Sequence, residues 1–263
     1  MHNAAFATHG IDATYELRPI ELADVAGFFE EAHGPEWLGF GVTAPYKQVA
    51  LDHLDVVEPG AQAIGAVNNG VRTDDGALVG FNTDASGFMA AVRSMGVSVS
   101  GGEAVVVGAG GAARAVVWAL LDAGASSVHV ANRTPERAAE LARDLGVFGD
   151  VVPGALDEPF LATALESAVI AVNATTQGMT TDTVAFDVDA LPEGALVFDL
   201  VYVPPETPLV RAATTRGLPV CNGMEMLVRQ GEVAFERWTG IGSTADTMRA
   251  ALETWLAPRD PEP

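Results

Sequence analysis

Apolar and polar residues in the first third of the chain change their spacing from one short segment to the next. Apolar residues recur every three to four positions over 21–32, which is typical of an amphipathic helix. Two apolar runs, 66–72 and 77–82, flank Thr73-Asp74-Asp75-Gly76, a sequence that favours a hairpin turn. By the same criteria we expect helices over 1–8 and 84–95 and strands over 13–19 and 37–42.

From about residue 103 the pattern becomes a regular alternation of short apolar runs and amphipathic segments. Short, continuously apolar runs are typical of strands buried on both faces of a parallel sheet. The predicted strands cover 104–107, 128–131, 147–152, 168–172 and 196–200. The predicted helices cover 111–123, 135–145, 209–216, 223–238 and 244–256. We therefore predict an α/β fold of two domains, formed by 1–84 plus 223–263 and by 85–222.

The composition allows a full core and excludes several classes of function. Apolar residues make up 49% of the 263 residues, and no apolar run has the length of a membrane span or follows a basic leader. Cys221 is the one cysteine, which fits a cytoplasmic protein, and the five histidines lack metal-ligand spacing. The net charge of −21 argues against nucleic acid and anionic membranes as partners.

The acidic residues also say something about the solvent. The 35 Asp and Glu residues outnumber the 14 Lys and Arg residues and are spread through every segment. Concentrated salt screens repulsion between such charges. The composition therefore predicts a halophilic protein.

Lys47 is the only lysine of the chain, and it ends the motif Val42-Thr43-Ala44-Pro45-Tyr46-Lys47. Lysine can lose a proton near neutral pH when it is partly desolvated, whereas arginine cannot. The motif predicts a helix that Thr43 caps and Pro45 begins, which places Lys47 in the first turn. A catalytic lysine is one interpretation, and an ordinary surface lysine is the other.

A glycine-rich segment after the predicted strand 104–107 indicates a dinucleotide site. Glycine allows the tight turn and the close approach of a pyrophosphate, and the following helix offers free N–H groups to phosphate oxygens. This strand–turn–helix context predicts a Rossmann-like domain with a loop made of Gly108, Ala109, Gly110, Gly111 and Ala112.

The end of the next predicted strand indicates which dinucleotide is bound. An NAD site usually has an acidic residue there, for the ribose 2′-hydroxyl. This chain has Asn132-Arg133-Thr134, with Arg137 one turn later, and guanidinium groups bind a 2′-phosphate well. The sequence therefore predicts NADP as the cofactor. Arg137 could instead form an ion pair with Glu140, so Arg133 is the stronger candidate.

Several motifs in this order resemble those of the shikimate dehydrogenase family. They are the lysine motif, Gly65-Ala66-Val67-Asn68, Asn82-Thr83-Asp84, the glycine loop, Asn132-Arg133-Thr134, Asn173-Ala174-Thr175 and Met226-Leu227-Val228-Arg229-Gln230. The resemblance covers nearly the whole chain. It implies reduction of 3-dehydroshikimate to shikimate with NADPH, in a cleft between a substrate domain and a Rossmann-like domain, with the C-terminal helices returning to the first domain.

The resemblance also implies roles for individual residues. Lys47 and Asp84 would be the catalytic pair. The substrate's hydroxyls would bind Asn68, Thr83 and Gln230, and its carboxylate Thr43 and Tyr202. The cofactor would contact Thr175, Leu200, Gly223 and Met226 besides the residues named above. Structural roles are the alternatives: a turn for Asn68, a helix N-cap for Asp84 and core packing for Met226.

The chain departs from the family's motifs in two places. Gly41 stands where the family usually has asparagine, which we expect to loosen the loop without ending catalysis. Met1 falls inside the family's first helix, so a strand and a serine loop that binds the substrate carboxylate are absent. We expect the natural chain to carry about one strand-plus-loop unit of at least ten residues before Met1.

Two other functions stay open at this point. One is a broader quinate/shikimate dehydrogenase, which Arg133 and Arg137 disfavour because such relatives often use NAD. The other is a non-catalytic relative that senses ligands, which would not need the Lys47–Asp84 pair. The expected partners are a small-molecule substrate and a second copy of the chain in a homodimer.

Overall fold

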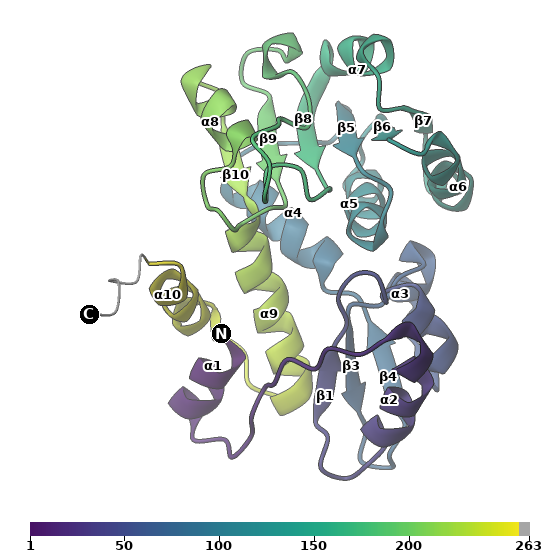
Figure 1. Cartoon of the computed structure of the whole chain (residues 1–263), viewed down its shortest axis with the longest axis vertical. Helices are drawn as coiled ribbons and strands as arrows, with labels where there is room; N and C mark the ends of the chain where they lie inside the picture. Colours follow the sequence, from purple (N-terminus) through teal and green to yellow (C-terminus); the bar gives the residue numbers. More distant parts are fainter. Residues whose placement is uncertain (258–263) are drawn as a thin grey trace.

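The structure is a computed structural model that describes residues 1–257. Its larger sheet has six parallel strands in the order β10-β9-β8-β5-β6-β7 (Figure 1). The strands are β5 (Glu103–Val107), β6 (Ser127–Asn132), β7 (Val151–Ala155), β8 (Ala168–Asn173), β9 (Leu196–Asp199) and β10 (Val220–Asn222). The strand order reverses at β5 and β8, where ligands bind at the carboxyl edge of open α/β sheets. The predicted parallel sheet is confirmed.

Helices cover both faces of this sheet. The side chains of a strand point alternately to its two sides, and in β5 they are apolar on both. Ala104 and Val106 belong to the core formed with α4, α5 and α6, whereas Val105 and Val107 belong to the core formed with α7 and α8. The bounds of these helices are α4 Asp84–Ser94, α5 Gly111–Asp122, α6 Pro135–Leu145, α7 Glu158–Leu165 and α8 Pro208–Thr215.

The smaller sheet is mixed and has four strands in the order β1-β3-β4-β2. Its central pair, β3 (Asn69–Arg72) and β4 (Leu78–Phe81), is antiparallel, which confirms the predicted hairpin. The outer strands are β1 (Gly39–Gly41) and β2 (Val56–Val57), and the nearby helices are α2 (Val25–Ala32) and α3 (Pro59–Ile64). Phe29 of α2 packs edge-on against Phe40 of β1 in the core of this layer.

Helices α4 and α9 (Gly223–Thr239) lie between the two sheets and pack tightly against each other (Figure 1). A Cβ atom at Gly87 of α4 would lie 2.9 Å from the carbonyl oxygen of Met226 in α9. Only glycine allows this approach. The last helix, α10 (Ala245–Leu256), shares a core with α9 and α1 (His2–His9), as the predicted return of the C-terminal helices to the first domain requires.

The structure corrects the predicted strand 13–19, which has no regular secondary structure. The Asn3 side chain takes both backbone hydrogen bonds of Tyr15, accepting from its N–H at 2.6 Å and donating to its carbonyl at 3.0 Å. A side chain therefore occupies the groups that a neighbouring strand would bind.

The predicted helix of the lysine motif is also wrong. Residues 44–48 form turns, and a 3₁₀ helix begins only at Val49 (Val49–His53). The backbone is bound elsewhere, because Val67 N–H donates to Lys47 O at 2.8 Å and Val42 N–H donates to Asn68 O at 2.8 Å. Thr43 therefore does not cap a helix.

The remaining differences concern short or shifted elements. The predicted helix 21–32 is divided into a 3₁₀ turn (Leu22–Asp24) and α2, and the strand predicted at 147–152 is β7, which begins at Val151. A further 3₁₀ turn covers Val188–Ala190, and the sequence did not predict α3, α7, β2 or β10. None of the helices within residues 1–257 is long and apolar enough to cross a lipid bilayer.

Candidate active site

Lys47 and Asp84 form a short ion pair between the two sheets. Lys47 lies in the turn after β1, and Asp84 is the first residue of α4. Lys47 Nζ lies 2.6 Å from Asp84 Oδ2, and the two side chains are 15% and 2% exposed. Solvent screens a pair this buried only weakly. The surface interpretation of Lys47 is therefore wrong.

Asn68 connects this pair to three further polar groups. Its Nδ2 lies 2.8 Å from Asp84 Oδ1, 3.0 Å from Thr83 Oγ1 and 3.0 Å from Gln230 Oε1. Its Oδ1 accepts from the Thr83 backbone N–H at 2.8 Å. The structure thus brings together five residues that the sequence singled out, from the turn after β1, the segment before β3, the start of α4, and α9. We name Lys47, Asn68, Thr83, Asp84 and Gln230 the catalytic cluster, after the role that the family resemblance implies for Lys47 and Asp84.

Two asparagines to which the sequence analysis assigned no role hold this cluster in place. Asn82 Oδ1 accepts from the N–H groups of Asp84 and Ala85, so Asn82 caps α4 and leaves the Asp84 carboxylate to Lys47. The N-cap interpretation of Asp84 is therefore wrong. Asn69 Nδ2 donates to Thr83 Oγ1 at 3.0 Å. A signal for Asn82 was present, since it lies two residues before the predicted helix 84–95 and asparagine near a helix start is a common capping residue.

Thr43 and Tyr202 lie apart from this hydrogen-bond network. Thr43 is exposed in the turn that carries Lys47, and Tyr202 is half-buried in the segment after β9. Within residues 1–257, no hydrogen bond connects either side chain to the catalytic cluster. Their expected contact with a substrate carboxylate stays a prediction.

The glycine loop lies between β5 and α5, as predicted. Gly108 has φ +119°, which favours glycine, and a Cβ atom there would lie 2.9 Å from the carbonyl oxygen of Ala174. Gly110 precedes α5 without a side chain to cap it, and the space around its Cα is open. The free N–H groups of the first turn of α5, including Ala112, are therefore available to phosphate oxygens, so this loop fits a dinucleotide.

The same loop touches Lys47. A Cβ atom at Gly111 would lie 3.1 Å from Lys47 Cβ and 3.2 Å from Lys47 Cδ. The aliphatic part of Lys47 therefore passes directly over the first residue of α5. This contact joins the candidate cofactor loop to the catalytic cluster.

Arg133 and Arg137 lie at the carboxyl end of β6, next to the β5 loop in the sheet. Both are exposed, and among the side chains that the structure describes neither guanidinium has a carboxylate partner. The alternative pairing of Arg137 with Glu140 is thus not formed. Asn132 Nδ2 donates to Thr134 O at 2.9 Å and shapes this turn. The two guanidiniums are free to bind a phosphate.

A buried network fixes the ends of β8 and β9. Asp199 is fully buried and accepts from Asn173 Nδ2 at 2.9 Å and Thr207 Oγ1 at 2.6 Å. Burial raises the pKa of Asp199 above its usual value. Asn173 Oδ1 in turn accepts from Thr175 Oγ1 at 2.7 Å, and Asn173 O accepts from Leu200 N–H at 2.9 Å. Asn173 and Asp199 therefore position two of the predicted cofactor residues.

The other two predicted cofactor residues lie at the start of α9. Gly223 packs so closely against the Leu200 carbonyl that a Cβ atom would overlap it. Met226 is buried in the core with α4 and α5, as its packing interpretation requires. In the part of the chain that the structure describes, no group of three His, Cys, Asp or Glu side chains is placed to hold a metal ion.

These features define a class of protein: a two-domain α/β oxidoreductase with a dinucleotide loop beside a lysine–aspartate pair. Three family descriptions match consecutive parts of the chain. They are "Shikimate dehydrogenase substrate binding domain" over residues 1–69, "Shikimate / quinate 5-dehydrogenase" over 90–204 and "Shikimate 5'-dehydrogenase C-terminal domain" over 223–253. The chain belongs to the shikimate dehydrogenase family.

Individual relatives agree over nearly the full length. The protein named shikimate dehydrogenase (NADP(+)) from Moorella thermoacetica is 41% identical over 256 residues, which cover 96% of this chain and 86% of the relative. The protein of the same name from Halobacterium salinarum is 42% identical over 257 residues, which cover 97% and 93%. A Thermus thermophilus shikimate 5-dehydrogenase, solved with NADP(H) and shikimate, has a TM-score of 0.85 and 39% identity, and 96% and 92% of the two chains are covered.

The comparisons confirm the predicted family. Two further expectations concern salt adaptation and the segment before Met1. The halobacterial relative agrees with the predicted salt adaptation without testing it. The matches give no support to the expected strand and serine loop before Met1.

Proposed function

We propose that Lys47 and Asp84 are the catalytic pair of this family member, acting on 3-dehydroshikimate and shikimate. Its activity is that of an NADP-dependent shikimate dehydrogenase in the shikimate pathway. The observation that carries the proposed roles is the 2.6 Å contact of Lys47 Nζ with Asp84 Oδ2, next to the glycine loop. A non-catalytic ligand sensor would not need this pair.

The chemistry follows from what a ketone needs during reduction. NADPH, when bound, supplies the hydride. Negative charge then develops on the ketone oxygen, and Lys47 Nζ is the cationic donor of the catalytic cluster that can stabilise it and give it a proton. In the reverse direction neutral Lys47 accepts the proton of the shikimate hydroxyl. Asp84 holds Nζ in place throughout and can accept a hydrogen bond from a neighbouring hydroxyl.

The rest of the catalytic cluster fits the substrate's hydroxyl groups. Asn68, Thr83 and Gln230 carry donors and acceptors next to the pair, and their mutual hydrogen bonds fix their orientation. We assign the substrate carboxylate to Thr43 and Tyr202. We also assign residues 1–84 plus 223–263 to the substrate domain and residues 85–222 to the cofactor domain.

The cofactor residues follow the carboxyl edge of the larger sheet. The pyrophosphate would bind the loop of Gly108, Ala109, Gly110, Gly111 and Ala112. The 2′-phosphate would bind Arg133 and Arg137, with Asn132 and Thr134 shaping their turn. The nicotinamide would lie against Thr175, Leu200, Gly223 and Met226. Two guanidiniums that have no carboxylate partner among the described side chains, in a chain of net charge −21, support the preference for NADP over NAD.

One assay tests this proposal. Purified protein in molar potassium chloride is mixed with NADP and shikimate, and formation of the reduced cofactor is followed by absorbance. Parallel reactions replace shikimate with quinate and NADP with NAD. We expect turnover with shikimate and NADP to exceed each alternative. Equal turnover of quinate would favour the broader specificity, and binding without turnover would favour a ligand sensor.

We also propose a cytoplasmic location and a homodimer. The single cysteine, Cys221, agrees with a reducing compartment. Sedimentation at several protein concentrations would measure the oligomeric state, and a monomer at all concentrations would exclude the homodimer.

A further inference from the structure

Arg114 extends from the cofactor side of the molecule to the substrate side. It lies in the first turn of α5, and the residue is only 6% exposed. Arg114 Nε donates to the carbonyl oxygen of Ile64 at 2.8 Å, and Nη2 lies 2.9 Å from Asp144 Oδ2 in α6. Ile64 is the last residue of α3, which packs beside the smaller sheet. One guanidinium thus joins α5 and α6 to α3.

The segment that Arg114 holds leads directly into the catalytic cluster. Gly65 ends α3 with φ +70°, and a Cβ atom there would lie 2.7 Å from Arg114 Nη2. Two residues later, the Val67 N–H donates to the Lys47 carbonyl at 2.8 Å. Asn68 follows, with its bonds to Asp84, Thr83 and Gln230. Ile64 and Asn68 are therefore four residues apart, with Arg114 at one end and the catalytic pair at the other.

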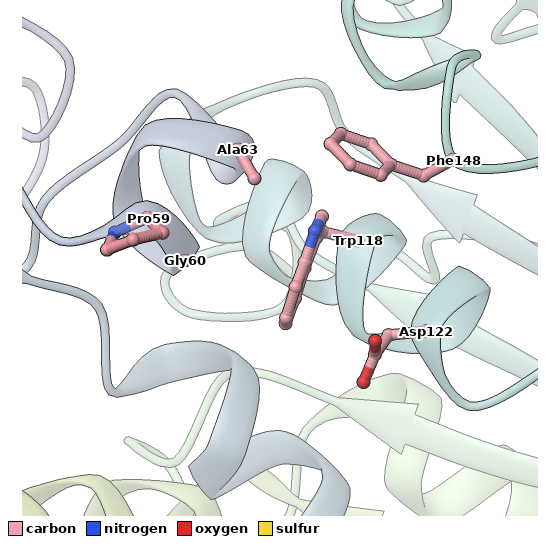
Figure 2. A pocket seen from close by; sticks show the side chains of 6 residues that line it. All are labelled: Pro59, Gly60, Ala63, Trp118, Asp122 and Phe148. Carbon is pink, nitrogen blue, oxygen red and sulfur yellow. The ribbon is translucent and has the colours of Figure 1, made fainter.

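Further along α5 from Arg114, helices α3 and α5 are separated by a groove. Figure 2 shows Pro59, Gly60 and Ala63 of α3 across a groove from Trp118 and Asp122, the residues one and two turns further along α5. The groove has a volume of about 310 Å³ and is lined mostly by apolar atoms. Along this groove α3 and α5 are not packed against each other, whereas at the end of α3 Ile64 packs into the core that includes α5. The hydrogen bond from Arg114 to the Ile64 carbonyl adds a directional polar contact at that end.

We propose that Arg114 is a positioning residue that couples dinucleotide binding to substrate binding. The first turn of α5 carries the glycine loop, touches Lys47 through Gly111 and holds residues 64–68 through Arg114. A dinucleotide that fixes this turn therefore also fixes Lys47 and Asn68 for the substrate. Coupling of this kind is reciprocal, so shikimate strengthens NADPH binding by the same factor. The inference rests on the proposed roles of Lys47 and Asn68.

The test uses Arg114→Met, which keeps the length of the side chain and removes its donors. Asp144→Asn is the second variant, because it leaves the Ile64 bond and weakens the anchor of the guanidinium. The control is Arg143→Met, which removes an exposed arginine of α6 with no carboxylate partner among the described side chains. Affinity for NADPH is measured by calorimetry with and without saturating shikimate, a pair that does not react. KM and kcat are measured for shikimate with NADP.

In wild type and Arg143→Met we expect shikimate to strengthen NADPH binding by about fivefold or more. In Arg114→Met the factor by which shikimate strengthens NADPH binding should fall towards one. The affinity for NADPH without shikimate should change less than about twofold. KM for shikimate should rise by a larger factor than kcat falls. The factor in Asp144→Asn should lie between those of wild type and Arg114→Met. If Arg114→Met does not fold, Asp144→Asn provides the test. Unchanged coupling in either variant, or no coupling in wild type, overturns the proposal. Wild type without shikimate turnover would instead refute the proposed function.

Discussion

Replacing Lys47 with methionine removes the ammonium and keeps the part of the side chain that passes over Gly111. The packing of the glycine loop against residue 47 should therefore survive, since the three atoms nearest to a Cβ at the Gly111 position are Lys47 Cβ, Cγ and Cδ. Asp84 Oδ2 loses its 2.6 Å partner, and Asp84 Oδ1 keeps the Asn68 amide at 2.8 Å. The variant thus removes one cationic donor with little other change in shape.

The magnitude of the effect on turnover follows from the charge that develops on the substrate oxygen. A positioned proton donor contributes about two to four orders of magnitude to rate, and one donor to a developing oxyanion contributes about 2.7–4 kcal/mol. Because the pair is little exposed, bulk water does not replace Lys47 efficiently. We expect kcat to fall by about two to four orders of magnitude. Shikimate affinity should fall much less, because Asn68, Thr83 and Gln230 remain.

The effect on folding is separate and smaller. A hydrogen bond to a charged group contributes about 1.5–3 kcal/mol to the free energy of unfolding, and the variant loses one. Chemical denaturation measures this loss, and kcat is then determined where the variant is fully folded. Asp84→Asn serves as the partner variant. Because the two groups act as one unit, the losses in kcat should not add in the double variant.

The result that would refute the reasoning is a folded Lys47→Met protein with near-normal kcat. Additive losses in the double variant would also contradict it, because Lys47 and Asp84 would then act independently. A large loss of NADPH affinity would show that Lys47 serves the cofactor loop through Gly111 more than the substrate.

Three further predictions concern the cofactor, acid and salt. Arg133→Ala should weaken NADP binding by about 1.5–3 kcal/mol and leave NAD activity nearly unchanged, since one charge-assisted contact is lost; equal losses with both cofactors in steady-state assays would make Arg133 structural. Burial and the neighbouring Met1 ammonium lower the pKa of His2 to about 4. As the pH falls from ~6.5 to ~4, the unfolded chain therefore binds a proton at His2 and the folded chain does not. The free energy of unfolding should then decrease by up to about 3 kcal/mol. Denaturation of wild type and His2→Phe across that range should show a shallower loss in the variant, and parallel curves would exclude His2 as the cause. The unfolding temperature should rise with potassium chloride up to about 1 M, where the Debye length is about 3 Å; a flat or falling curve in calorimetry would contradict the halophilic interpretation.

Much of the fold could be predicted from the sequence because long elements with strong periodicity carry their own signal. Helix α6 was predicted with the observed bounds, and the strands β5 and β8 to within one residue at either end. The lysine motif shows where such reasoning fails. Thr43 and Pro45 have the local preferences of a helix start, but tertiary hydrogen bonds from Val67 and to Asn68 hold this backbone in turns. The segment 13–19 fails for a similar reason, since the Asn3 side chain binds Tyr15.

The candidate site could be predicted where residue type and order along the chain indicate chemistry. The lone lysine and the glycine loop belong to this kind, and the five residues of the catalytic cluster do meet. Packing contacts between distant segments could not be predicted in the same way. Nothing in the sequence shows that Gly111 lies under Lys47 or that Arg114 binds the Ile64 carbonyl 50 residues earlier in the chain. Such pairs depend on where two folded layers meet.

The single lysine has a practical consequence for chemical labelling. Amine-selective reagents usually modify many surface lysines and give mixed products, whereas this chain offers them only the Met1 amino group and Lys47. Lys47 is 15% exposed and bound to Asp84, whereas the half-buried Met1 has no such ion pair among the described residues and burial lowers the pKa of its amino group, so the Met1 amine reacts more readily. Brief labelling would therefore attach a dye or a surface at Met1. Slower modification at Lys47 would report, in a peptide digest, how often the catalytic cluster opens to solvent.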